Sequence, residues 1–98
     1  MYGTIARLRA KPGAHELLMD VGTQDPVRRV PGSVTRHIYR SDADPNEYWL
    51  TVVFESREAY LANAASPAQD ASYRRLREFL ASDPEWHDGE IVSAFVAI

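Results

Sequence analysis

The sequence predicts an α+β fold, in which short helices cover one side of an antiparallel sheet. The first observation behind this prediction is a segment, residues 47–54, that reads as a strand with apolar side chains on both faces. One face holds Tyr48, Leu50, Val52 and Phe54, and the other holds Trp49, Thr51 and Val53. The second observation is that only about three short helices can be recognised elsewhere, enough to cover one side. A strand that is apolar on both faces has to be covered on both sides of the sheet. Because the helices cover one side, we expect a second copy of the chain to cover the other side.

The first half of the chain predicts two strands and one helix before this central strand. Residues 2–10 read as a strand that Lys11-Pro12-Gly13 stops, because proline cannot donate to the ladder and glycine permits the turn. Residues 14–21 have helical spacing, and the helix is expected to end at Gly22 or extend to Gln24. Residues 33–40 alternate as a second strand. The polar, turn-forming segment 41–47 then predicts a long hairpin into the central strand.

The second half predicts two helices and a closing strand. Ser56 is a good N-cap for a short helix over residues 57–63. Ser66, Pro67 and Gln69 form a capping-box pattern with proline at the first helical position, and the helix is expected to continue over residues 71–81. Residues 83–89 read as a turn-rich segment, and residues 91–98 as a fourth strand. The order is therefore β-α-β-β-α-α-β, a ferredoxin-like arrangement.

Size and composition narrow the function classes. The chain has 98 residues, which predicts a single domain over residues 1–98. A formal net charge of −3 argues against a nucleic-acid partner, because a general nucleic-acid binder shows a basic face. The absence of cysteine excludes disulfides, thiolate metal sites and cysteine nucleophiles. No apolar run approaches the ~20 residues that cross a bilayer, and the N-terminus runs directly into a strand-like alternation. We therefore expect a cytoplasmic protein without a membrane partner.

Short motifs along the whole chain carry a resemblance to a known family. They are Lys11-Pro12-Gly13, Pro31-Gly32, Arg40-Ser41-Asp42, the strand-to-helix junction Val53-Phe54-Glu55-Ser56-Arg57-Glu58-Ala59-Tyr60, and Ser66-Pro67. With these motifs in this order, the chain resembles the antibiotic biosynthesis monooxygenase family of the dimeric α/β-barrel superfamily. The resemblance implies a homodimer in which two sheets pack face to face across a two-fold axis. It also implies a pocket in each subunit, between its sheet and its helices.

The activity implied by the resemblance is oxidation of a small phenolic, quinol or polyketide-type aromatic substrate by O₂, without a cofactor or metal. An electron-rich phenol, once deprotonated, passes an electron to O₂ itself. The protein then has to supply a largely apolar pocket, a base, and donors that hold the anion.

Three residues are the candidates for catalysis. His37 lies mid-strand and has the intrinsic pKa of a general base, although a histidine bonded across a dimer interface is the alternative reading. Asn63 lies near the end of the short helix, where many relatives carry histidine; asparagine can orient a substrate or donate to an oxyanion but cannot act as a base. Tyr73, one helix later, is placed to reach the same pocket, and the alternative is a core tyrosine with a bonded hydroxyl.

Three aromatic residues, Tyr39, Trp49 and Phe54, are the candidates for substrate binding. Tyr39 shares a strand face with His37. Trp49 is expected to line either the pocket or the dimer barrel, and an ordinary core position is the alternative for an aromatic on a buried strand.

Two functions from different classes fit the sequence. The first is a cofactor-independent monooxygenase, and the second is a non-catalytic dimeric module that binds a small hydrophobic ligand. An isomerase or lyase on the same fold is a third option, because one fold hosts many functions.

Overall fold

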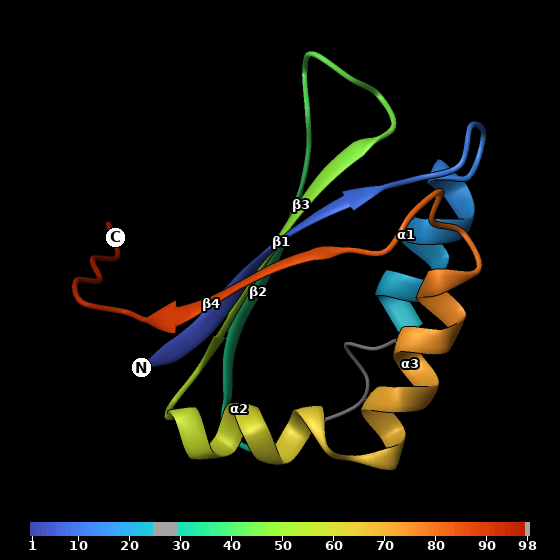
Figure 1. Cartoon of the computed structure of the whole chain (residues 1–98). Helices are drawn as coiled ribbons and strands as arrows, with labels where there is room; N and C mark the ends of the chain where they lie inside the picture. Colours follow the sequence, from blue (N-terminus) through green and yellow to red (C-terminus); the bar gives the residue numbers. More distant parts are fainter. Residues whose placement is uncertain (25–29, 98) are drawn as a thin grey trace.

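The computed structural model describes residues 1–24 and 30–97, and over these residues the predicted order of strands and helices is confirmed. The elements are β1 (Tyr2–Arg9), α1 (His15–Gln24), β2 (Ser33–Arg40), β3 (Glu47–Phe54), α2 (Arg57–Ala64), α3 (Pro67–Arg77) and β4 (Glu85–Glu90). The strands form a sheet in the order β2-β3-β1-β4, and every neighbouring pair is antiparallel. Figure 1 shows the helices on one side of this sheet, the α+β ferredoxin-like arrangement that the sequence predicts.

Side-chain alternation divides the sheet into two faces. The even-numbered residues of β1, β3 and β4 point toward the helices, and among them Thr4, Ala6, Leu8, Tyr48 and Phe54 are buried. The odd-numbered residues point away from the helices, and we call this side the open face. It is formed by Ile5, Arg7, His37, Tyr39, Trp49, Thr51, Val53 and His87.

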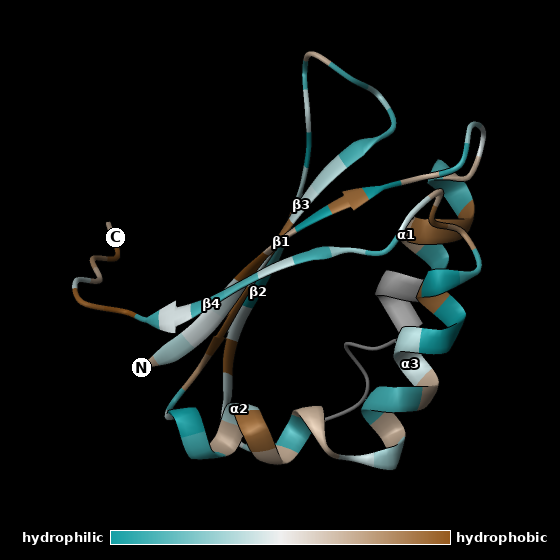
Figure 2. Cartoon of the chain, in the orientation of Figure 1, coloured by the Kyte–Doolittle hydropathy of each residue, from teal (hydrophilic) through white to brown (hydrophobic). Residues whose placement is uncertain are grey.

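The hydrophobic core lies where β1 meets α1 and the end of α3. It contains Ala6, Leu8, Ala10, Ala14, Leu18, Tyr48 and Leu80. Tyr48 is only 2 % exposed, and its hydroxyl lies 2.5 Å from Nδ1 of His15, so this buried polar group is hydrogen-bonded. Figure 2 shows apolar residues along the central strands, on parts of the helices and in the C-terminal segment. In the described part of the chain, no helix is long and apolar enough to span a bilayer.

The junctions around α2 and α3 follow from the predicted capping residues. Ser56 Oγ accepts the backbone N–H of Ala59, and Ser66 Oγ accepts that of Gln69, both at 3.1 Å. Gly32 in the Pro31-Gly32 motif has φ +78°, and a Cβ there would lie 2.5 Å from the Cβ of Ala59. Glycine is therefore required at this position both by the backbone conformation and by the close approach of α2.

The prediction of the fourth strand is wrong. The sequence places it at residues 91–98, whereas β4 is Glu85–Glu90, in the segment that reads as turn-rich. The register explains the difference, because Glu90 pairs with Tyr2 at the start of β1. Residues after 90 run past the end of β1 and find no strand beside them. The described part of this segment, residues 91–97, has no regular structure, and Ile98 lies outside the described residues.

The last helix also ends earlier than predicted. It stops at Arg77, and the chain then turns so that Leu80 forms a bridge with Ala10. Leu80 is fully buried, which gives the reason for the early end: a straight continuation to residue 81 would carry this side chain away from β1.

Candidate active site

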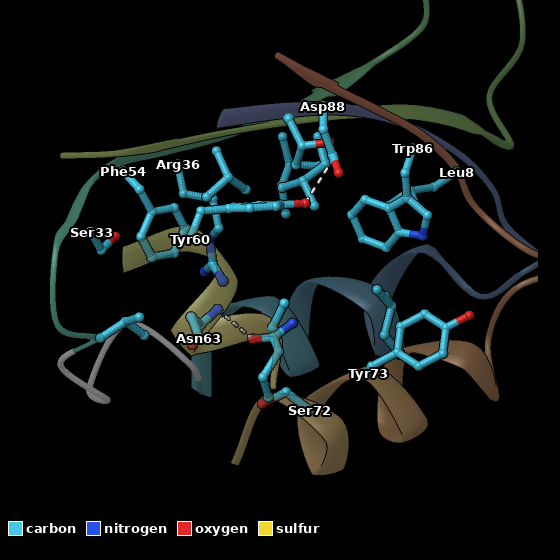
Figure 3. Close-up of a pocket in the computed structure, with 18 of the residues that line it drawn as sticks. Leu8, Ser33, Arg36, Phe54, Tyr60, Asn63, Ser72, Tyr73, Trp86 and Asp88 are labelled. Atoms are coloured by element: carbon cyan, nitrogen blue, oxygen red, sulfur yellow. Dashed lines mark hydrogen bonds between the residues drawn. The ribbon is translucent and has the colours of Figure 1, made fainter. Parts of the chain in front are cut away.

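A cavity of about 780 Å³ lies between the sheet and the helices. Its volume falls in the range typical of small-molecule sites. Figure 3 shows side chains of β2, β3, β1 and β4 above the cavity and those of α2 and α3 below it. The lining is mainly apolar on the sheet side, through Leu8, Ile38, Leu50, Val52 and Phe54. These are even-numbered residues, and strand alternation together with the register between the strands places them on the face of the sheet that meets the helices.

A tyrosine and a carboxylate meet across the cavity, Tyr60 from α2 and Asp88 from β4. The hydroxyl of Tyr60 donates a hydrogen bond of 2.8 Å to Oδ1 of Asp88 (Figure 3). Burial, followed by the hydrogen bond and the negative charge of Asp88, raises the pKa of Tyr60 to about 12. Tyr60 is therefore a neutral hydrogen-bond donor at physiological pH.

The hydroxyl of Thr4 is the buried polar group that this site leaves unsatisfied. Thr4 is 5 % exposed, lies directly across from Asp88 on the neighbouring strand, and lines the cavity. No hydrogen-bond partner lies at bonding distance from its Oγ1 among the described residues. An unpaired buried hydroxyl costs free energy, and a bound ligand with a polar atom at this place would remove that cost.

An amide pair holds the helix side of the cavity. Nδ2 of Asn63 donates to Oε1 of Gln69 at 3.3 Å, which links the end of α2 to the start of α3. The backbone N–H of Ser66 donates to the carbonyl of Asn63 at 2.9 Å and fixes the turn between them. The side chain of Asn63 is thereby oriented, and its amide is placed to exchange hydrogen bonds with a ligand.

Two aromatic rings form the end of the cavity near α3. Tyr73 and Trp86 have ring centroids 6.5 Å apart, with an interplanar angle of 49°. Figure 3 shows them side by side, with Leu8 next to Trp86. The rings form an apolar wall suited to the edge or face of a planar aromatic molecule.

The predicted site residues divide between the two sides of the sheet. Asn63, Tyr73 and Phe54 line the cavity together. The other three, His37, Tyr39 and Trp49, lie on the open face, where Tyr39 is opposite Trp49 and the rings of His37 and Tyr39 are 6.4 Å apart. His37 is therefore separated from Asn63 and Tyr73 by the sheet itself. The catalytic and binding roles of all six stay predictions.

Sequence reasoning missed Tyr60, Asp88 and Trp86 as residues of the site. Asp88 and Trp86 belong to the segment that the sequence predicts as a turn. Side chains in a turn do not alternate between two faces, so the sequence pattern does not indicate that these two point toward the helices. Tyr60 carried a usable signal, because it precedes Asn63 by three positions on a helix and so lies on the same side of it. Among the described residues, no cluster of three or more histidine, aspartate or glutamate side chains is placed to hold a metal ion.

The raised pKa of Tyr60 gives a prediction about pH. Ultraviolet titration of the wild type and of Tyr60→Phe isolates the ionisation of the Tyr60 phenol as the difference between the two curves. This difference should be centred near pH 12, whereas an exposed tyrosine has a pKa of 10.0. Because the folded state holds this proton more tightly than the unfolded state, the Tyr60 contribution to stability should fall as the pH rises from 10 to about 12.

The matched variant for this titration is Asp88→Asn, which removes the negative charge. It should lower the pKa of Tyr60 and leave burial as the main remaining cause of the shift. The same pKa of Tyr60 in the wild type and in Asp88→Asn would contradict the hydrogen bond to Asp88, and a wild-type titration centred near pH 10 would contradict the effect of burial as well.

Solved structures of other proteins share the fold of this chain. A protein from Chloroflexus aurantiacus J-10-fl, described as a candidate antibiotic biosynthesis monooxygenase, is 26% identical, with 97% of this chain and 96% of that chain covered and a TM-score of 0.79. SnoaB, a cofactor-independent oxygenase from Streptomyces nogalater solved as an asparagine-to-alanine mutant, is 18% identical, with 95% and 94% covered and a TM-score of 0.82. The likeness to SnoaB shows a shared fold.

Among curated proteins, none matches this chain. The sequence profile described as antibiotic biosynthesis monooxygenase matches residues 1–75, from β1 through most of α3. That match covers more than half of the sequence and includes the strand-to-helix junctions that the fold uses to build the cavity. The chain belongs to the antibiotic biosynthesis monooxygenase family.

Proposed function

We propose that this protein is a cofactor-independent monooxygenase that oxidises a small phenolic, quinol or polyketide-type aromatic with O₂ in the cavity between sheet and helices. The observation that carries the proposal is the combination of the Tyr60–Asp88 pair with the unpaired Thr4 hydroxyl in a largely apolar cavity of about 780 Å³. The family and the fold shared with a cofactor-independent oxygenase support it.

The reaction consumes one phenol and one O₂ and forms one quinone and one water. The phenol transfers an electron to O₂ and loses its hydroxyl proton, which leaves a phenoxyl radical beside superoxide. The two radicals combine through a ring carbon, and the peroxide takes up the proton. Loss of the hydrogen on that carbon, together with cleavage of the O–O bond, leaves a carbonyl and releases water. The substrate supplies all the electrons, so the protein's task is proton transfer and charge stabilisation.

Asp88 is the base in this proposal. Its Oδ1 accepts the Tyr60 hydroxyl, and its other carboxylate oxygen is assigned to the phenol of the substrate. A carboxylate is a weak base toward a resting phenol. Loss of the electron makes the phenolic proton strongly acidic, so the proton passes to Asp88 together with the electron transfer to O₂ and not after it. Tyr60 holds the carboxylate in place through its hydrogen bond.

The other lining residues receive roles that match their chemistry. Asn63, oriented by Gln69, donates to the oxygen on which negative charge develops. Tyr73, Trp86 and Phe54 hold the aromatic rings of the substrate and keep water away from the radical pair.

Oxygen uptake tests this proposal. The purified protein should consume O₂ with a panel of dihydroquinones and polycyclic phenols faster than autoxidation. Asp88→Asn should lower the rate by about 100-fold or more, because it removes the base; Asn63→Ala should lower it by removing a donor. His37→Ala should retain turnover, because its imidazole is on the open face.

The control for Asp88→Asn is Asp83→Asn, since Asp83 is an exposed carboxylate outside the cavity that pairs with Arg77. Binding of the same compounds by a folded protein without O₂ uptake would contradict the oxygenase and favour the ligand-binding module. Loss of turnover in His37→Ala with Asp88→Asn fully active would move the chemistry to the open face.

We also infer that a second copy of the chain covers the open face. Ile5 at the centre of this face is 50 % exposed and Tyr39 is 56 % exposed. Beyond the sheet, Val92, Phe95 and Val96 of the C-terminal segment are between 78 % and 92 % exposed. Figure 1 shows this segment running away from the helices.

The open face also carries charged side chains that are paired with each other. Nη2 of Arg7 lies 2.6 Å from Oε2 of Glu47, and Oε1 of Glu47 accepts the indole N–H of Trp49. An apolar surface with internally paired charges suits self-association across a two-fold axis.

Two substitutions with equal exposure test the dimer. Ile5 on the open face and Leu17 on α1 are each 50 % exposed. Ile5→Arg should shift the sedimentation coefficient from dimer to monomer, because a charge would be buried between the sheets. Leu17→Arg should leave the dimer intact. A wild-type monomer, or an unchanged dimer in Ile5→Arg, would contradict this inference.

A further inference from the structure

Four residues that line the cavity form one straight row across the sheet. Arg36 on β2 pairs with Val52 on β3, Val52 pairs with Thr4 on β1, and Thr4 pairs with Asp88 on β4. All four side chains face the cavity. Neighbouring strands lie about 4.8 Å apart, so the backbones at the two ends of the row are separated by about 14 Å.

The row changes in chemical character from one end to the other. It begins with the guanidinium of Arg36, continues with an apolar side chain and a buried hydroxyl that has no hydrogen-bond partner among the described residues, and ends at the carboxylate of Asp88. Arg36 is the cation among the described lining residues. Figure 3 shows Arg36 extending from the sheet into the cavity on the side away from Trp86. A ligand lying along this row would meet a positive charge at one end and the proposed base at the other.

The acidic lining residues already have partners of their own. Oδ2 of Asp70 lies 3.0 Å from Nε of Arg74, and Asp88 accepts the hydroxyl of Tyr60 at the far edge of the sheet. Arg36 also interacts with the chain itself, but its guanidinium carries five N–H donors, so it can bind a ligand oxygen at the same time. Arginine binds carboxylates in a bidentate geometry, which gives both affinity and orientation.

We propose that Arg36 determines specificity and that the preferred substrate is a fused-ring aromatic hydroxy acid. Its carboxylate binds Arg36, its rings lie over Val52, and its phenolic hydroxyl reaches Thr4 and Asp88. This inference rests on the proposed function for the assignment of the reacting end. What is new is that the substrate carries an anionic group, on the ring opposite the one that is oxidised.

A matched pair of ligands tests the inference. The first is 5,8-dihydroxy-2-naphthoate, a hydroquinone with its carboxylate on the other ring, and the second is 1,4-dihydroxynaphthalene, which lacks the carboxylate. Calorimetry without O₂ should show that the wild type binds the acid about tenfold or more tightly, the strength expected of a charge-assisted hydrogen bond. In Arg36→Gln the two ligands should bind equally, while affinity for the neutral one stays unchanged.

Two further variants separate the position and the geometry of Arg36 from its charge. Arg57→Gln removes the same charge from an exposed position that does not line this cavity, and it should retain the preference for the acid. Arg36→Lys keeps the charge without the bidentate geometry and should retain part of the preference. Circular dichroism establishes that each variant is folded.

Oxygen uptake with the same two ligands separates this inference from the proposed function. A preference for the acid that depends on Arg36, without O₂ uptake, would support the binding assignment and overturn the oxygenase. Uptake with equal binding of the two ligands in the wild type would overturn the role of Arg36 and leave the oxygenase standing. A preference that persists in Arg36→Gln would also overturn it.

Discussion

The antiparallel register of β1 with both of its neighbours is the constraint on which the rest of the structure depends. It pairs Thr4 with Val52 on one side and with Asp88 on the other. Because side chains alternate, a slip of one residue would move every one of them to the opposite face of the sheet. The same register directs Trp86 and Asp88 toward the helices and Ile5 and His87 away from them. Cavity and open face are therefore two consequences of one pairing.

Most of the fold could be predicted from local signals. The stop at Lys11-Pro12-Gly13, the caps at Ser56 and Ser66, and the two-faced β3 each have a physical cause within a few residues, and each is found in the structure. The fourth strand could not be predicted in this way. β4 is an edge strand with polar side chains, and its pairing with β1 is decided by the register. The apolar segment after it reads as a strand but extends past the end of β1.

The candidate site shows the same division between local and long-range information. Asn63 and Tyr73 were within reach of sequence reasoning, because helical spacing and motif position place them. Strand alternation also puts His37 and Tyr39 on a common face, but it does not say whether that face meets the helices. A bulge between Ser33 and Thr35 shifts the register of β2 and adds to that ambiguity. Asp88 joins Tyr60 only through tertiary structure, since 28 positions separate them in the sequence.

We propose that aromatic substrates bind between the sheet and the helices, and methyl nuclear magnetic resonance distinguishes this site from the open face. Intermolecular Overhauser effects would be recorded without O₂ between 1,4-dihydroxynaphthalene and the protein's methyl groups. Ile38 and Leu76 line the cavity, whereas Ile5 and Val53 lie on the open face. We expect contacts from the ligand to Ile38 and Leu76. Contacts confined to Ile5 and Val53 would contradict it.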